Sequence, residues 1–179
     1  KRKWHKIIRY QQNQKATFCW LTAQDALAVW PELKRLHQLR WNKRGKPGAF
    51  NCTVFNQFHL TLITQHPETC YMSMLMIEGE VAAIHYYLQS KGYVHFYQAG
   101  WSEKYASFSP SAMLHLWSAQ QTACPVYDFM MGGINSYKQQ LGNLRETCYQ
   151  LDVHPDIKSY LLAILRKLKR LTGRYKWPS

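Results

Sequence analysis

The sequence is short of acidic residues, and this shortage sets its overall charge. Only 10 of its 179 residues are Asp or Glu, against 23 Lys and Arg, so the formal net charge is +13. An imbalance of this size predicts a partner or substrate that carries negative charge, such as a phosphate compound, a nucleic acid or a lipid surface. The charge by itself does not choose among the three.

Long apolar runs and closely paired cysteines are also missing. No stretch approaches the roughly 20 apolar residues that cross a bilayer, and the basic opening, KRKWHKIIRYQQNQ, lacks the apolar core and cleavage site of a signal peptide. The five cysteines include no C-x-x-C pair, which argues against both a disulfide framework and a zinc ribbon. These absences predict a cytoplasmic protein without a transmembrane segment or a bound metal. The chain does not begin with Met, so we expect it to be part of a longer protein.

The first third of the chain has mainly helical periodicity. Residues 15–22 predict a short strand, and Thr22 is a suitable N-cap for the helix that follows. Pro31 lacks a backbone N–H, so we expect it to divide the next apolar pattern into two helices. Asn51 is expected to cap a third helix, which ends at His66.

From residue 70 the apolar pattern changes to that of strands. Three strands are predicted at 70–77, 80–89 and 93–100, joined by two-residue turns at Glu78-Gly79 and Lys91-Gly92. Turns of this length connect antiparallel neighbours, so the three strands form a meander.

Two histidines of this meander invite a metal hypothesis. The turn at Lys91-Gly92 places His95 opposite Leu88 and His85 opposite Gln98. The two imidazoles therefore lie on opposite faces of the sheet and are not expected to share an ion.

After the meander the pattern becomes strand, helix, strand. Ser109 and Pro110 begin a helix predicted over 109–124, and a strand at 126–129 follows. A helix that joins two neighbouring strands predicts that 126–129 runs parallel to 93–100. The rest of the chain is predicted as a short helix at 134–142, a strand at 145–153 and an amphipathic helix from Pro155.

The stretch VYDFMMGGINSYKQQLG, residues 126–142, concentrates side chains that carry chemistry. Asp128 lies in an apolar strand, and burying a bare carboxylate is costly, so it needs a hydrogen-bond or cationic partner. Tyr137 and Lys138 follow two glycines and lie near the carboxyl end of the strand, where open α/β sheets bind ligands. A purely structural acid that ties down a loop is the alternative for Asp128.

Two further features fit an anion. The first turn of the 109–124 helix contains no acid, so its N–H groups are open to a phosphate, although most helix starts bind only water. Basic clusters at 1–9, 34–46 and 166–176 contain or adjoin aromatic residues, which is typical of a nucleic-acid surface and equally of a solvated basic face.

Several motifs together resemble one superfamily. The chain is similar to the Gcn5-related N-acetyltransferases (GNAT), and in particular to the CelD-like branch associated with polysaccharide synthesis and related to the FemAB peptidyltransferases. The motifs are LHQLRWNKRGKPGAF (36–50), FNQFHLTL (55–62), IEGEVAAIHYYL (77–88), YQAGW (97–101), SPSAMLHLW (109–117) and YDFMMGGINSYKQQ (127–140).

The resemblance implies an α/β fold: a GNAT-like mixed, mostly antiparallel sheet flanked by helices, with a β-α-β crossover in the second half. It implies one domain over residues 1–179, expected to be the C-terminal half of a longer two-domain protein. The implied activity is N-acyl transfer from acetyl-CoA or another acyl-CoA to the amine of a small molecule or amino sugar.

The resemblance also implies residue roles. The catalytic residues would be Asp128, Tyr137 and Lys138, with Tyr137 protonating the leaving thiolate. The cofactor would contact Ala99 and Gly100 on one strand and Ser109, Ser111, Ala112 and Met113 at the start of the following helix, and the substrate would contact Arg40 and Trp41.

Two other functions remain open at this point. A FemAB-like transferase would use aminoacyl-tRNA, which the positive charge favours, since nonspecific nucleic-acid affinity comes mainly from phosphate neutralisation. A non-catalytic GNAT-like module would bind RNA or an anionic surface.

Overall fold

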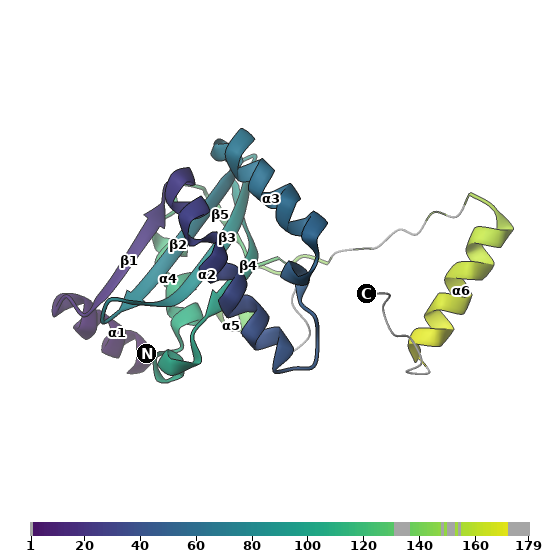
Figure 1. Ribbon diagram of the computed structural model, residues 1–179. Helices are drawn as coiled ribbons and strands as arrows, with labels where there is room; N and C mark the ends of the chain where they lie inside the picture. The colour runs from purple at the N-terminus through teal and green to yellow at the C-terminus, as the bar shows by residue number, and fades with distance from the viewer. Residues whose placement is uncertain (1, 131–136, 148, 150–152, 154, 172–179) are drawn as a thin grey trace. The chain divides into compact units, whose positions relative to one another are not determined.

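The computed structural model describes the chain except for residues 1, 131–136, 148, 150–152, 154 and 172–179 (Figure 1). Its contacts divide the chain into two compact units, Lys1–Asn143 and Leu144–Ser179. The first unit contains all the strands that the structure describes, and the second contains helix α6 (Ile157–Leu171). Among the described helices, none is both long and apolar enough to cross a bilayer.

Five strands form one sheet, and their order across the sheet is their order along the chain (Figure 1). They are β1 (Ala16–Leu21), β2 (Cys70–Ile77), β3 (Glu80–Ser90), β4 (Tyr93–Trp101) and β5 (Val126–Asp128). The first four are antiparallel to their neighbours, and β5 is parallel to β4. Helix α4 (Pro110–Gln121) connects the parallel pair. The predicted α/β class, with a mixed, mostly antiparallel sheet and a β-α-β crossover, is confirmed.

The two predicted turns lie where the sequence places them. Glu78 and Gly79 have φ angles of 54° and 79°, and Lys91 and Gly92 have φ angles of 48° and 82°. Positive φ at both central residues is the conformation that matches the twist of a two-residue hairpin. A glycine at the second position removes half of the steric cost.

A bulge in β4 shifts the predicted register by one residue. His95 pairs with Leu88 as predicted, but His85 pairs with Ala99 instead of Gln98, because Tyr97 is an extra residue between the pairs on either side. His85 contacts Ser111 of α4, and His95 contacts Asp128. Within the described part of the chain, no group of three or more His, Cys, Asp or Glu side chains is placed to hold a metal ion.

Helices cover both faces of the sheet (Figure 1). On one face, α1 (Arg2–Gln12) and α4 pack against a core that includes Phe18 and Leu75. On the other face, α2 (Ala23–Asn42) and α3 (Thr53–Gln65) pack against a core that includes Phe50 and Tyr86. Each central strand therefore buries side chains on both of its faces.

Pro31 does not divide α2, which corrects the sequence prediction. The helix runs unbroken through Pro31 from its N-cap, Thr22, whose hydroxyl accepts a hydrogen bond from the Asp25 N–H at 3.1 Å. A proline inside a helix costs about 3 kcal/mol. Trp30 and Leu33, on either side of it, are buried in the core, and burying each side chain contributes about 1.5–3 kcal/mol. Tertiary packing therefore outweighs the local preference.

Three further boundaries differ from the predictions. Asn51 belongs to a 3₁₀ turn, Ala49–Asn51, so Cys52 takes the N-cap position of α3. Helix α4 ends at Gln121 instead of residue 124, and α6 begins at Ile157 instead of Pro155. The predicted strand at 145–153 is wrong for its described residues, which are irregular, and the rest of it lies outside the described residues. Short helices complete the fold: 3₁₀ turns at Pro67–Thr69 and Glu103–Phe108, and α5 (Lys138–Leu141).

Candidate active site

The parallel strands β4 and β5 stay together for only three residues. Their paired positions are Tyr93 with Val126, Val94 with Tyr127 and His95 with Asp128. Strand β4 continues to Trp101, so its segment 96–101 extends beyond the last residue that β5 pairs. The two strands therefore part in the middle of β4. Helix α4 follows β4 in the chain, and α5 follows β5.

The start of α4 favours an anion. Its first turn contains no acidic residue, and the N-cap, Ser109, makes no capping hydrogen bond with its side chain. Ser109 has a φ of 51°, a left-handed conformation that is strained for a residue with a side chain. The N–H groups of the first turn and the positive end of the helix dipole are thus not occupied by the usual capping side chain.

Tyr137 lies between helices α2 and α4. Its hydroxyl is 3.0 Å from Nε2 of His115, and 42% of its surface is exposed. Burial raises the pKa of Tyr137, while the charge of Arg40 and a hydrogen bond from Ser111 oppose that rise. The structure thus brings together three predicted site residues, Arg40, Ser111 and Tyr137, from separate parts of the chain.

A network of buried polar side chains lies behind Tyr137. His115 Nδ1 is 2.7 Å from the Tyr127 hydroxyl, and His85 is 3.1 Å from the Tyr87 hydroxyl and 2.9 Å from Ser111 Oγ. Burial lowers the pKa of His115 to about 3 and that of His85 well below its usual value. Both imidazoles are therefore neutral at neutral pH.

Sequence reasoning missed this network. It treated His85 only as a possible metal ligand and assigned no role to His115. A signal was present, because Ser111, His115 and Ser118 recur at i, i+4 and i+7 on an otherwise apolar helix. A polar stripe at helical spacing indicates a face that packs against hydrogen-bonding partners.

Asp128 and Lys138 lie at the end of β5. One oxygen of Asp128 is 2.9 Å from His95 Nδ1, and the other accepts a hydrogen bond from the Met130 N–H at 2.7 Å. Lys138 donates to the Phe129 carbonyl, and burial lowers its pKa while the charge of Asp128 opposes that shift. The Asp128 carboxylate thus holds the chain where it leaves the sheet, and its charge also favours the protonated form of Lys138.

Both predicted cofactor residues on β4 are closely packed. Ala99 is buried near Phe96, and a Cβ on Gly100 would lie 2.7 Å from the Leu36 Cβ and 2.9 Å from the Leu33 carbonyl. Only glycine therefore lets α2 approach β4 this closely. At the start of α4, Met113 is buried and Ala112 is half-buried, both against the core shared with α1.

Arg40 and Trp41 lie at the C-terminal end of α2. Arg40 is half-buried, and burial together with the charge of Arg44 lowers its pKa. The ring of Trp41 lies against that of His37, tilted by 35° with ring centres 5.8 Å apart. A cavity of about 340 Å³ opens beside Arg40, between this end of α2 and the end of β4, and is lined by Arg35, Leu36, Leu39, Arg40, Lys43, Trp101, Ser102 and Glu103.

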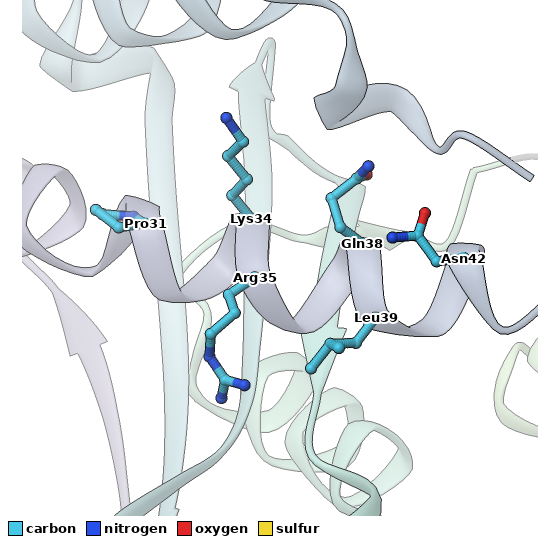
Figure 2. Close-up of a pocket in the computed structure, with 6 residues that line it drawn as sticks. All are labelled: Pro31, Lys34, Arg35, Gln38, Leu39 and Asn42. Atoms are coloured by element: carbon cyan, nitrogen blue, oxygen red, sulfur yellow. The ribbon is translucent and has the colours of Figure 1, made fainter.

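A second hollow, of about 370 Å³, lies on α2 alone. Figure 2 shows its six lining residues, Pro31, Lys34, Arg35, Gln38, Leu39 and Asn42, all projecting from that helix. It brings no reactive side chains from other elements together. The cavity beside Arg40 is therefore the better candidate for a substrate site.

The fold, together with the cluster of Arg40, Ser111 and Tyr137, indicates the class of the protein. A mixed, mostly antiparallel sheet with a β-α-β crossover is the arrangement that the sequence resemblance implied. Residues 2–139 match the family model described as "Acetyltransferase (GNAT) domain". The match covers more than half of the chain, so the chain belongs to the GNAT acetyltransferase family. The predicted enzyme class, an acyltransferase, is confirmed at this level.

Solved structures with the same fold include two acetyltransferases. One is a possible acetyltransferase from Clostridium difficile 630, with 12% identity, a TM-score of 0.55, and coverage of 79% of this chain and 98% of that chain. The other is the aminoglycoside acetyltransferase meta-AAC0020 from an uncultured soil metagenomic sample, in complex with sisomicin, with 11% identity, a TM-score of 0.56, and coverage of 80% and 99%. No curated protein matches the sequence. Identities this low establish the shared fold only.

Proposed function

We propose that this protein transfers an acyl group from an acyl-CoA, such as acetyl-CoA, to the amine of a small molecule. The observation that carries the proposal is the Tyr137 hydroxyl, held 3.0 Å from His115 where β4 and β5 part. A phenol at this position is suited to protonate the thiolate that leaves when the amine takes the acyl group. The backbone of Ala99 and Gly100, on the part of β4 beyond β5, would face the reacting carbonyl.

The start of α4 fits the diphosphate of CoA. Residues 109–113 present a helix N-terminus without an acid, and helix starts of this kind bind phosphate. The Oγ of Ser111 is 2.9 Å from His85, so this side chain is engaged with the sheet. CoA, when bound, supplies the acyl group as a reactive thioester. The contributions of Ser109, Ser111, Ala112 and Met113 are to hold the diphosphate and to seat the helix on the core.

The cavity beside Arg40 would hold the acceptor. Lys43 is paired with Glu103 at 2.7 Å and Arg35 with Glu32 at 2.6 Å, whereas the electrostatic neighbours that shift the pKa of Arg40 are Arg44 and Tyr137. A half-buried cation in such surroundings favours an acceptor that carries a carboxylate, a phosphate or several hydroxyls beside its amine. An amino sugar or amino-acid derivative has these groups. Trp41, the other predicted substrate residue, is not among the residues that line this cavity, whereas Trp101 is.

The membership of the CelD-like branch, and with it a role in polysaccharide synthesis in the cytoplasm, stays a prediction. It rests on the motifs around Arg40 and Tyr137. An acceptor drawn from amino sugars in the test below would support it.

The test is acyl transfer by the full chain, measured as thiol release from acetyl-CoA and longer acyl-CoAs with a panel of amino sugars and amino-acid derivatives. Tyr137→Phe is expected to lower kcat by roughly 10²-fold, the contribution of one proton-transfer partner, with the Kd for acyl-CoA unchanged. Lys138→Ala is expected to act on the KM for the acceptor. An unchanged kcat in Tyr137→Phe would show that the phenol is not the acid.

The same assay separates the alternatives. Transfer from aminoacyl-tRNA, with no turnover of any acyl-CoA, would support the FemAB-like function. Salt-sensitive RNA binding without turnover of either donor would support a non-catalytic module.

A further inference from the structure

His115 makes two hydrogen bonds, and its charge state limits how they are arranged. Nδ1 is 2.7 Å from the Tyr127 hydroxyl and Nε2 is 3.0 Å from the Tyr137 hydroxyl. The ring is fully buried, and burial together with the charge of Lys138 keeps its pKa near 3. A neutral imidazole has one N–H, so it donates to one tyrosine and accepts from the other.

The geometry around Tyr127 selects the tautomer. Its hydroxyl has a single proton and two acceptors within reach, His115 Nδ1 at 2.7 Å and the Tyr87 hydroxyl at 3.4 Å. The shorter distance is ideal for a hydroxyl donor, and the longer one is at the weak end of the range. We place the proton of Tyr127 on the shorter contact, so that it donates to Nδ1 and the N–H of His115 lies on Nε2 and points at the Tyr137 oxygen. In the opposite arrangement Tyr127 donates to Tyr87, Nδ1–H donates to Tyr127, and Nε2 accepts from Tyr137. The test below separates the two, because loss of an acceptor for the Tyr137 proton would lower the pKa of Tyr137 instead of raising it.

Charged and titratable groups face this pair from each element around it. Arg40 comes from α2, Lys138 from α5 and His85 from β3. His85 is neutral and lies against His115, with ring centres 4.3 Å apart. Arg40 keeps its charge at neutral pH. Burial lowers the pKa of Lys138, while the charge of Asp128 opposes that shift.

We propose that His115 is a positioning residue for Tyr137. His115 donates its Nε2–H to the Tyr137 oxygen and stabilises the phenolate, while Tyr127 fixes the tautomer of His115. The proposal rests on the proposed function for its role in catalysis, although the hydrogen bond itself does not. With the His115 N–H directed at its oxygen, the proton of Tyr137 is directed away from His115, toward the reaction space. A hydrogen bond from a neutral donor to an anionic oxygen is stronger than one to a neutral phenol, so its effect is largest after the proton has left.

The proton transfers balance without a further reactant. As the amine nitrogen bonds to the acyl carbon and the carbon–sulfur bond breaks, the O–H bond of Tyr137 breaks and an S–H bond forms. The phenolate then takes up the proton that the nitrogen releases. His115 keeps its proton throughout and supplies a fixed dipole.

The test measures the ionisation of Tyr137 without requiring turnover. 3,5-Difluorotyrosine, whose phenol ionises near neutral pH, is placed at position 137 of the full chain, and its pKa is followed by fluorine NMR. His115→Phe keeps a ring but removes both nitrogens, and we expect the pKa of the probe to rise by about one unit or more, the scale of a hydrogen bond to a charged group. Tyr127→Phe leaves Nε2 in place but frees the tautomer, so we expect a smaller rise.

Two matched variants keep the test decisive if His115→Phe fails to fold. His115→Gln retains an N–H donor and should leave the pKa close to that of the unmodified site. Gln120→Ala, at an exposed position of the same helix, should also leave it unchanged. A pKa that stays the same or falls in His115→Phe, or one that rises as far in His115→Gln, would overturn the proposal.

Kinetics then link the hydrogen bond to catalysis. In the protein with its natural tyrosine, His115→Phe should lower kcat at least about 10-fold without raising the KM for acyl-CoA, and His115→Gln should restore most of the loss. A probe whose pKa shifts as expected in a protein that transfers no acyl group would refute the proposed function and leave the role of the hydrogen bond standing.

Discussion

Two buried histidines, His85 and His115, make the stability of the fold depend on pH. Their folded pKa values lie below that of an unfolded histidine, which is about 6.5. Between the folded and unfolded values the unfolded chain binds more protons, so the stabilisation is complete above about pH 6.5 and is lost as the pH falls. Stability falls at low pH because the two histidines are neutral in the folded core and become protonated when the chain unfolds.

The size of this effect can be measured. With a folded pKa near 3, lowering the pH from about 7.5 to 5 should remove about 2 kcal/mol for His115 alone. We expect urea denaturation midpoints to fall over this interval, and to fall less in His115→Gln, which has no titrating group. Equal losses in the two proteins would show that His115 is not buried in its neutral form.

At the scale of elements, Pro31 leaves helix α2 without one internal hydrogen bond. Pro31→Ala restores an N–H that can donate to the Leu27 carbonyl one turn earlier, in a helix that already runs unbroken. Removing proline from the helix interior should gain up to about 3 kcal/mol. Alanine also gives the unfolded chain more conformational freedom, which costs about 0.4–1 kcal/mol. The first effect is larger, so the variant should unfold at a higher urea concentration. Glu32→Ala, at the next position, loses only an exposed pair with Arg35 and should change little. A less stable Pro31→Ala would show that the ring itself packs usefully.

At the contact between α2 and β4, by contrast, a substitution to alanine should destabilise the fold. Gly100→Ala would place a methyl group 2.7 Å from the Leu36 Cβ, so either the helix or the strand must shift. Overpacking of this kind costs about 1–3 kcal/mol. Because Gly100 lies on the part of β4 beyond β5, we also expect weaker acyl-CoA binding by calorimetry. Gly45→Ala also adds a methyl group, at a position where no atom lies within 4 Å but φ is +67°, so it should lose stability through backbone strain and leave acyl-CoA binding unchanged.

Local sequence patterns predicted most helices and strands. Those predictions failed where packing against distant residues outweighs the local preference. Gly79 and Gly92 each occupy the second position of a two-residue turn between strands whose apolar residues alternate. The hairpins, and with them the antiparallel part of the sheet, could therefore be predicted from the sequence. The unbroken helix at Pro31 could not, because its cause is the burial of Trp30 and Leu33 against residues from other elements.

The site shows the same division. Arg40, Ser111 and Tyr137 were predicted one by one from family motifs, and the structure brings them together. The histidine and tyrosine network was missed because Tyr87, Tyr127 and His115 lie on three separate elements and carry no local pattern that relates them. The bulge at Tyr97 was missed for a related reason, since an alternating strand gives no sign of an extra residue.

At the scale of the whole molecule, the charge of +13 should act on the donor more than on the chemistry. CoA carries several negative charges, and attraction over distances beyond about 8 Å is screened at physiological ionic strength. We expect the KM for acetyl-CoA to rise as salt increases while kcat stays constant. The acetyl thioester of N-acetylcysteamine, which has the same reactive group without phosphates, is the matched control, and its KM should not respond to salt. A salt effect of equal size on both donors would contradict an electrostatic origin.

The strand order of the sheet, β1 to β5 in sequence, bears on how the protein is made. A chain leaves the ribosome from its N-terminus, and here every new strand finds its partner already synthesised, at the open edge of what has formed. None of the described strands has to be inserted between two that are already paired, so assembly can keep pace with translation. The last of the described strands to arrive is β5, only three residues long, and Tyr137, the N-cap of α5, follows it. The proposed acyl-transfer site is therefore completed after the sheet that supports it.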